Sequence, residues 1–270
     1  MKNNQKVIVF LSVILITVGC RETKEESRPI ENGPWIKEAQ VLRTINNVNF
    51  NFPDNGFAFE NKGELVKESF NALKSNIQLI GLEEFNDTIY IRFLRSREDM
   101  FPLTATRANG NAYPHIRTLY VVANEHSKPP INHELMHLIS MLEWDYPPAT
   151  TTWMNEGLGT FAENNRSGWN VAEIYRFLMQ NDKLISMHFL TSDFYRQPEM
   201  IAYHQSGYIV DHLLTNYSIE QFSKLWKSGF EKFEEIYGVP YSKVKFDLDK
   251  AVTEKYPTVP EIDWEEFTKI

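Results

Sequence analysis

The sequence predicts an α+β fold, in which a small N-terminal lobe of mixed sheet and helix is followed by a helical C-terminal lobe. Two observations lead to this prediction. Before residue 123, short runs alternate apolar and polar residues with the period of a strand, whereas from about residue 131 onward apolar residues recur at helical spacing. With 270 residues, of which 42% are hydrophobic and 24% are charged, the chain is long enough to bury a proper core.

Three strands are expected in the N-terminal lobe. They cover residues 48–52, 88–94 and 116–122, and the alternation is clearest in Val48-Asn49-Phe50-Asn51-Phe52. The polar residues 107–111 are expected to form a loop, and residues 116–122 are expected to form the edge strand of the sheet.

A helix is predicted between the first two strands. Apolar residues from Val66 to Ile80 have helical spacing, Gly81 provides the stop, and Asn61 with Glu64 has the pattern of a capping box. We expect this helix to lie across the sheet.

Several helices are expected in the second lobe. One begins after Pro129-Pro130 and ends at about Asp145, and the next begins near Thr152. Further apolar stripes start at Val171 and near Ile209. Ser218 and Gln221 predict a capped helix, whose aromatic residues we assign to the core.

The net charge of −8 excludes nucleic acid as an expected partner, because phosphate binding needs a basic surface. We also expect a monomer.

The first residues read as an export signal. Two lysines precede an apolar run from Val7 to Val18, and the run ends at Gly19-Cys20, which holds the only cysteine of the chain. This resembles the lipobox of bacterial lipoproteins, although Thr17 departs from the usual aliphatic residue. We therefore expect a signal peptide over residues 1–19, lipidation of Cys20 and a tether over residues 20–34. The alternative is an ordinary signal peptide with a chance cysteine.

The candidate chemistry begins with His133-Glu134-Leu135-Met136-His137. Histidines at i and i+4 project from one face of a helix and can share a zinc ion, while Glu134 can reach a water there without binding the metal. A third ligand is needed, and Glu156 follows at a spacing of eighteen residues. Taken alone, the first motif is equally typical of an amphipathic helix with a surface histidine.

The run from Trp153 to Glu163, with its Trp-Met-Asn-Glu-Gly start, resembles the third-ligand helix of gluzincin metallopeptidases of the peptidase MA clan, especially the aminopeptidase-like branch. The resemblance implies Zn²⁺ bound by His133, His137 and Glu156, with Glu134 as general base. It also implies a peptidase domain over residues 35–270, with lobes of about 35–125 and 126–270 and the zinc site in the cleft between them.

Members of that branch supply a tyrosine that stabilises the oxyanion. Ala202-Tyr203-His204-Gln205-Ser206-Gly207 looks like the segment that carries it, so Tyr203 is the candidate, with His204 and Tyr208 as alternatives. The remaining interpretation of Tyr203 is a packing tyrosine. Glu163 lies two helical turns after Glu156, where it either holds a ligand histidine or is solvated.

The Gly-x-Met-Glu-Asn stretch, with which aminopeptidases of the clan hold the substrate amino terminus, is absent, since the nearby Asn124-Glu125 has the reverse order. The resemblance is therefore closer to stand-alone peptidase-like domains.

We expect a zinc endopeptidase that acts on polypeptides and is lipid-anchored in the bacterial cell envelope. Lys24-Glu25-Glu26 resembles an export tag for the outer-membrane surface, or is a plain charged linker. The rival hypotheses are a non-catalytic surface lipoprotein that uses zinc for structure or binding, and a zinc hydrolase of a non-peptide amide.

Overall fold

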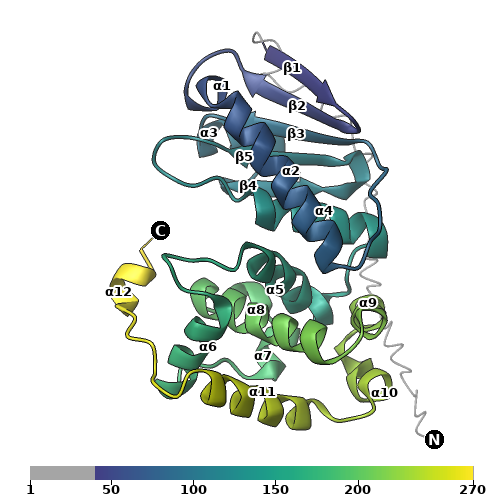
Figure 1. The fold of residues 1–270 in the computed structure, drawn as a ribbon, viewed down its shortest axis with the longest axis vertical. Coiled ribbons are helices and arrows are strands. Elements are labelled where there is room, and N and C mark those ends of the chain that lie inside the picture. The colour runs from purple at the N-terminus through teal and green to yellow at the C-terminus, as the bar shows by residue number, and fades with distance from the viewer. Residues whose placement is uncertain (1–39, 270) are drawn as a thin grey trace, which may run out of the picture. The chain divides into compact units, whose positions relative to one another are not determined.

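The computed structural model of the chain describes residues 40–269, which belong to the compact unit Gly33–Ile270. The expected signal peptide, the tether and Cys20 lie outside the described residues. The predicted α+β class is confirmed: a small mixed sheet with helices comes first in the chain, and only helices follow it (Figure 1).

The sheet has five strands in the order β1-β2-β3-β5-β4. The strands are β1 (Gln40–Ile45), β2 (Val48–Pro53), β3 (Ile89–Leu94), β4 (Gly110–Tyr113) and β5 (Thr118–Val122). The central strands β2, β3 and β5 run parallel, and the outer strands β1 and β4 run antiparallel to their neighbours. The alternation seen in the sequence is real in β2, where Val48, Phe50 and Phe52 are buried.

The predicted edge strand is wrong. Residues 118–122 form β5, which lies between β3 and β4 and has all five residues buried. The edge strand on this side of the sheet is β4, which begins inside the segment predicted as a loop. Four residues that read Gly-Asn-Ala-Tyr are too short and too polar to show the alternation of a strand.

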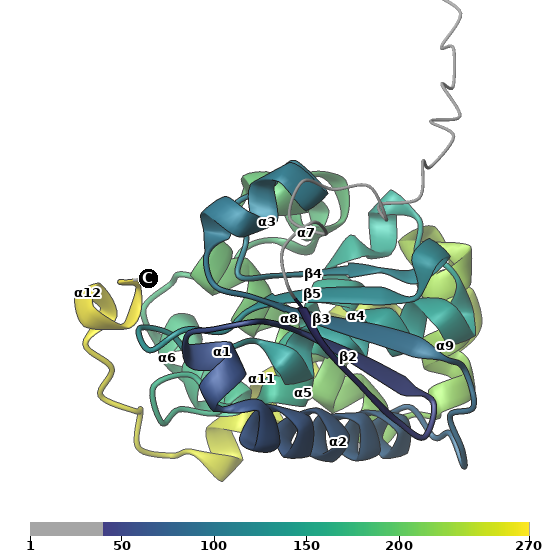
Figure 2. The ribbon, with the colours of Figure 1, turned by 90° about the horizontal axis from the view of Figure 1, so that it is seen from above.

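Helices accompany the sheet in the first part of the chain. They are α1 (Phe57–Glu60), α2 (Lys62–Leu79), α3 (Arg97–Thr104) and the 3₁₀ helix η3 (Pro114–Ile116). Helix α2 lies across the sheet, as predicted, and its Phe70 ring meets the ring of Phe50 edge-on at 5.7 Å (Figures 1 and 2). The predicted capping box is wrong, because the Asn61 side chain donates to the carbonyl of Phe57 at 2.8 Å and does not cap α2.

The rest of the chain is helical. The helices are α4 (Ile131–Trp144), α5 (Thr152–Glu163), α6 (Val171–Gln180), α7 (Met187–Ser192), α8 (Glu199–Asn216), α9 (Ile219–Ser228), α10 (Phe233–Tyr237), α11 (Tyr241–Lys255) and α12 (Trp264–Phe267), with 3₁₀ helices η4 (Ala149–Thr151), η5 (Phe194–Arg196) and η6 (Phe230–Lys232). The predicted capping box of Ser218 and Gln221 is confirmed at the start of α9. None of the helices within residues 40–269 has the length and apolar character of a membrane span.

Helix α4 joins the two parts of the fold. It packs against α2 and β4 on one side and against α5 on the other, and α5 packs in turn against α8. At the last contact Gly157 of α5 leaves no room for a side chain, because a Cβ atom there would lie 2.7 Å from the backbone of Ser206. The strands, α4, α5 and α8 therefore converge on one region.

Candidate metal centre

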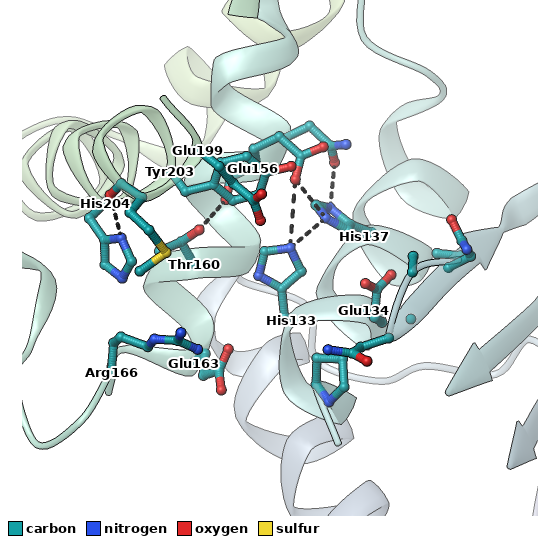
Figure 3. A pocket seen from close by; sticks show the side chains of 18 of the residues that line it. His133, Glu134, His137, Glu156, Thr160, Glu163, Arg166, Glu199, Tyr203 and His204 are labelled. Atoms are coloured by element: carbon teal, nitrogen blue, oxygen red, sulfur yellow. Dashed lines mark hydrogen bonds and ion pairs between the residues drawn. The ribbon is translucent and has the colours of Figure 1, made fainter. Parts of the chain in front are cut away.

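Two histidines and a glutamate meet where α4 faces α5. His133 and His137 lie one turn apart on α4, and their Nε2 atoms are 2.9 Å from each other. Oε2 of Glu156, on α5, lies 3.2 Å from Nε2 of His137 and 3.6 Å from Nε2 of His133 (Figure 3). The structure thus brings together the three residues predicted as ligands.

These three groups fit a zinc ion. Two ligand atoms bound tetrahedrally at about 2.0–2.1 Å from a metal are roughly 3.3 Å apart, and the three distances bracket that value. All candidate ligand atoms lie within 4.8 Å of one another, and within residues 40–269 no other group of three His, Cys, Asp or Glu residues is so arranged. Two imidazoles and one carboxylate are a donor set that zinc prefers.

Asn155 orients His137. Its Oδ1 lies 2.9 Å from Nδ1 of His137, so in the neutral ring Nδ1 carries the proton and Nε2 keeps its lone pair for a metal. The role of Asn155 was missed at the sequence level. The signal was present, because Asn155 directly precedes Glu156 and lies eighteen residues after His137.

The site favours positive charge. Burial disfavours the charged forms of both His137 and Glu156. The attraction between the imidazolium and the carboxylate is larger than this effect and favours both charged forms. The carboxylate of Glu156 raises the pKa of His137 to about 9, and the histidines hold the pKa of Glu156 below its ordinary value. The field that attracts a proton here also attracts a cation, so protons compete with a metal at low pH.

Glu134 lies beside the ligands without joining them. It follows His133 on α4 and lines the same cavity, but it is not part of the group of converging ligands (Figure 3). Burial raises its pKa, and the two histidines offset this rise only in part. A carboxylate with a raised pKa is better matched to proton transfer near neutral pH.

Gly110 of the edge strand β4 makes room for Glu134. A Cβ atom at Gly110 would overlap Cγ of Glu134 and lie 2.7 Å from its Oε1. The strand backbone therefore lies directly against the carboxylate side chain and limits where it can move.

The three candidates for an oxyanion donor are placed differently. Tyr203 lines the cavity, and its ring stacks on the His133 ring at 6.2 Å. Burial raises the pKa of Tyr203, which keeps its hydroxyl protonated and able to donate. Tyr208 packs against Tyr175 at 4.9 Å and does not line the cavity.

His204 lines the cavity but is unsuited to donation. Its Nδ1 lies 2.7 Å from the carbonyl oxygen of Met200 and so carries the proton of the neutral ring. Burial lowers the pKa of His204 to about 4, so Nε2 is an acceptor at neutral pH. Of the three candidates, Tyr203 alone offers a donor to the cavity.

Tyr195 was missed at the sequence level. It lies in η5, 39 residues after Glu156, and its hydroxyl donates to Oε1 of Glu156 at 2.7 Å. This bond fixes the plane of the Glu156 carboxylate and leaves its other oxygen, Oε2, facing the two histidines, where it can bind a metal. No sequence pattern marks Tyr195, because its contact depends on how the α7–η5 segment folds over α5.

Glu163 lines the cavity, and its side chain forms no hydrogen bond with His133 or His137 within the described chain. The interpretation in which it holds a ligand histidine is therefore not supported by its position.

The cavity has a volume of about 670 Å³ and extends to both sides of the three candidate ligands. Glu134 and residues 109–112 line one side. Arg166 and His204 lie on the side away from Glu134 (Figure 3).

Protonation of His204 should make the fold sensitive to acid. Its folded pKa of about 4 lies below the ordinary 6.5, so the unfolded chain binds the extra proton first. Above about pH 6.5 this proton does not affect the free energy of unfolding. As the pH falls toward 4, the free energy of unfolding decreases, by about 2 kcal/mol at pH 5. In His204→Asn the amide can still donate to the Met200 carbonyl. We expect the melting temperature of this variant to decrease less between pH 7 and pH 5 than that of the unmodified protein. His188→Asn, at an exposed position, is the matched control, and equal losses in the protein and His204→Asn would contradict the assignment.

Comparisons with known proteins give a family and several solved structures. The family profile described as Peptidase MA superfamily matches residues 101–240. A comparison with the curated proteins gives no significant match.

Among the solved structures that match are two M1 zinc metallopeptidases and an aminopeptidase N family protein. A two-domain M1 zinc metallopeptidase mutant bound to L-arginine has a TM-score of 0.39 and 13% identity, over 83% of this chain and 53% of that one. An M1 zinc metallopeptidase from Deinococcus radiodurans has a TM-score of 0.42 and 12% identity, over 79% and 50%. An aminopeptidase N family protein from Idiomarina loihiensis has a TM-score of 0.37 and 11% identity, over 85% and 45%. The chain thus spans about half the length of these structures.

The profile match takes in β4, both ligand helices and the segment from Tyr195 to Tyr203. It covers more than half of the 270 residues. The chain belongs to the Peptidase MA superfamily.

Proposed function

We propose that the protein is a zinc-dependent peptidase that hydrolyses peptide bonds within polypeptides. The observation that carries the proposal is the position of Glu134. The half-buried carboxylate of Glu134 lies in the same cavity as three converging metal ligands and is not itself one of them. A site built only to hold a metal has no need for such a group.

His133, His137 and Glu156 would hold the zinc ion, with Asn155 and Tyr195 fixing the orientation of two of these ligands. When bound, zinc supplies a Lewis acid that polarises a carbonyl and lowers the pKa of a water toward about 7. Glu134 would accept the proton of the attacking water and pass it to the leaving nitrogen. Tyr203 would donate to the oxygen that gains negative charge.

The edge strand β4 supports a polypeptide as substrate. It has a neighbour in the sheet on one side only, and its Gly110, Asn111 and Ala112 line the cavity. An extended peptide can add to such an edge by main-chain hydrogen bonds. The strand carries no carboxylate to hold a substrate amino terminus, which favours an endopeptidase.

Tyr203→Phe tests the role of the hydroxyl. The ring keeps its stacking on His133, so zinc content and melting temperature should change little, whereas turnover of a cleavable peptide should fall by about 10²–10³-fold. Tyr208→Phe removes a hydroxyl of the same helix that does not reach the cavity, and it should retain most of the activity. Equal turnover by the two variants would exclude Tyr203 as the oxyanion donor.

We also propose that Cys20 anchors the protein in the bacterial cell envelope. The support is the basic and apolar leader that ends at Gly19-Cys20. Cys20→Ser should move the protein from the membrane fraction to the soluble fraction and remove the lipid mass from the mature chain. Because one acyl chain binds membranes only marginally, the several chains of a lipoprotein are required. An exported chain with an unmodified Cys20 would contradict this proposal.

A further inference from the structure

Three arginines line the cavity, and two of them are engaged within the protein. Nε of Arg97 donates to Oδ1 of Asn109 at 2.8 Å, and the guanidinium of Arg107 lies 4.2 Å from the centre of the Phe101 ring. Arg166 differs, because its Nε is buried and has no hydrogen-bond partner. Among residues 40–269, no side chain forms an ion pair with its guanidinium.

The backbone of Arg166 is held in a tight turn. The amides and carbonyls of Arg166 and Trp169 are paired, with N···O distances of 2.9 and 3.0 Å. Between them, Ser167 and Gly168 have φ values of 52° and 88°, as in a type I′ turn. Oδ1 of Asn165 accepts a further hydrogen bond from the Gly168 amide at 3.0 Å. The turn presents Arg166 from a fixed backbone position, so little backbone freedom remains to be lost on binding.

The surroundings of Arg166 leave its charge available. Glu163 lines the same cavity but does not pair with it. His204 is close enough for the guanidinium to disfavour protonation of its imidazole, so the two do not present a cation pair at neutral pH. The cavity wall thus offers a guanidinium whose donors, one of them shielded from water, have no acceptor among residues 40–269.

We infer that Arg166 is a specificity-determining residue that binds a carboxylate of the peptide substrate, on the side of the cavity away from Glu134. This rests on the proposed peptidase function. The planar fork of donors of an arginine matches the two oxygens of a carboxylate, and the position beyond the ligand cluster suits a substrate that passes across it (Figure 3). The carboxylate can come from an Asp or Glu side chain or from the carboxyl terminus of the peptide.

The test compares matched peptides. In a peptide that the protein cleaves, each position is made Glu or Gln in turn, and the carboxyl terminus is made free or amidated. We expect kcat/KM to be about 10–100-fold higher for the carboxylate form at one location, since a charge-assisted hydrogen bond is worth that factor. Preference at a Glu position identifies a side chain, and preference for the free terminus identifies the terminal carboxylate.

Arg166→Gln should reduce that preference to about 1 while cleavage of the neutral peptides persists, and Arg166→Lys should retain part of it because the charge stays. Arg117→Gln is the matched control: Arg117 pairs with Asp87 at 3.1 Å and does not line the cavity. Preference at no position, or a preference unchanged in Arg166→Gln, overturns the inference. Circular dichroism of each variant checks that it is folded.

Binding separates this inference from the proposed function. Zinc-loaded Glu134→Gln, with and without Arg166→Gln, is titrated with the same peptides carrying a fluorescent label. If no peptide is cleaved but the carboxylate forms bind about 10–100-fold tighter through Arg166, the peptidase proposal fails and the binding role stands. If peptides are cleaved but neither rate nor binding depends on the carboxylate, the peptidase stands and the role of Arg166 is refuted. Absence of both cleavage and selective binding refutes both.

Discussion

Glu134→Gln should lower peptide turnover by about 10²–10⁴-fold and leave the zinc content near one ion per chain. The amide has the size of the carboxylate and fits in the narrow space against Gly110, but it cannot accept the proton of an attacking water. Because Glu134 is not one of the three converging ligands, metal affinity should be nearly unchanged. Turnover of a peptide and zinc by elemental analysis are the two measurements.

Glu143→Gln is the control for this variant, since Glu143 is an exposed residue of the same helix. It should behave as the unmodified protein does. If Glu134→Gln keeps the biological activity of the protein while loss of zinc abolishes it, the zinc is structural. The reading as a non-catalytic surface lipoprotein would then replace the peptidase.

Glu156→Gln should remove zinc as well as activity. A residue that only orients a ligand contributes about 10–100-fold to metal affinity, so loss of a ligand should cost more than about 100-fold. The amide also removes the negative charge that the Glu156 carboxylate places beside the two histidines and that attracts a cation to the site. Added zinc should raise the melting temperature of the chelator-treated protein and have little effect on the variant, since a ligand stabilises only a fold that binds it.

Glu163→Gln makes the contrast, because Glu163 lines the same cavity on the same helix and bonds to neither histidine. Its zinc affinity should stay within a few-fold of the unmodified protein. A Glu156→Gln variant that still binds zinc tightly would contradict the three-ligand site, and a Glu163→Gln variant that loses zinc would place Glu163 in it.

The ligand cluster was predictable because its information is local. Histidines four residues apart on one helix share a face whatever surrounds the helix. Glu156 was placed by its spacing and by the motif around it, and the structure brings it within 3.2 Å of His137. The α+β class was equally accessible, since periods of two and of about 3.6 residues separate the two halves of the chain.

The parts that sequence could not supply depend on contacts between distant segments. Which strand takes the edge of the sheet is decided by pairing, and β4 has only four residues to signal it. The bond from Tyr195 to Glu156 joins residues 39 apart, through a 3₁₀ helix that follows no apolar period. Asn61 matched the spacing of a cap, but the carbonyl of Phe57 was the nearer partner for its side chain.

The contact at Gly157 bears on how this site can change during evolution. There the helix that carries Glu156 meets the backbone of the helix that carries Tyr203, with no side chain between them. Where side chains fill the space between two helices, exchanging one apolar residue for another changes the distance between the helices in small steps. Two backbones in direct contact allow no such change. The distance between Glu156 and Tyr203 is therefore expected to stay the same among related chains. Insertions among descendants of this chain should therefore be tolerated away from this contact, and also away from Arg166 and Tyr195, which the connection between the two helices brings to the site.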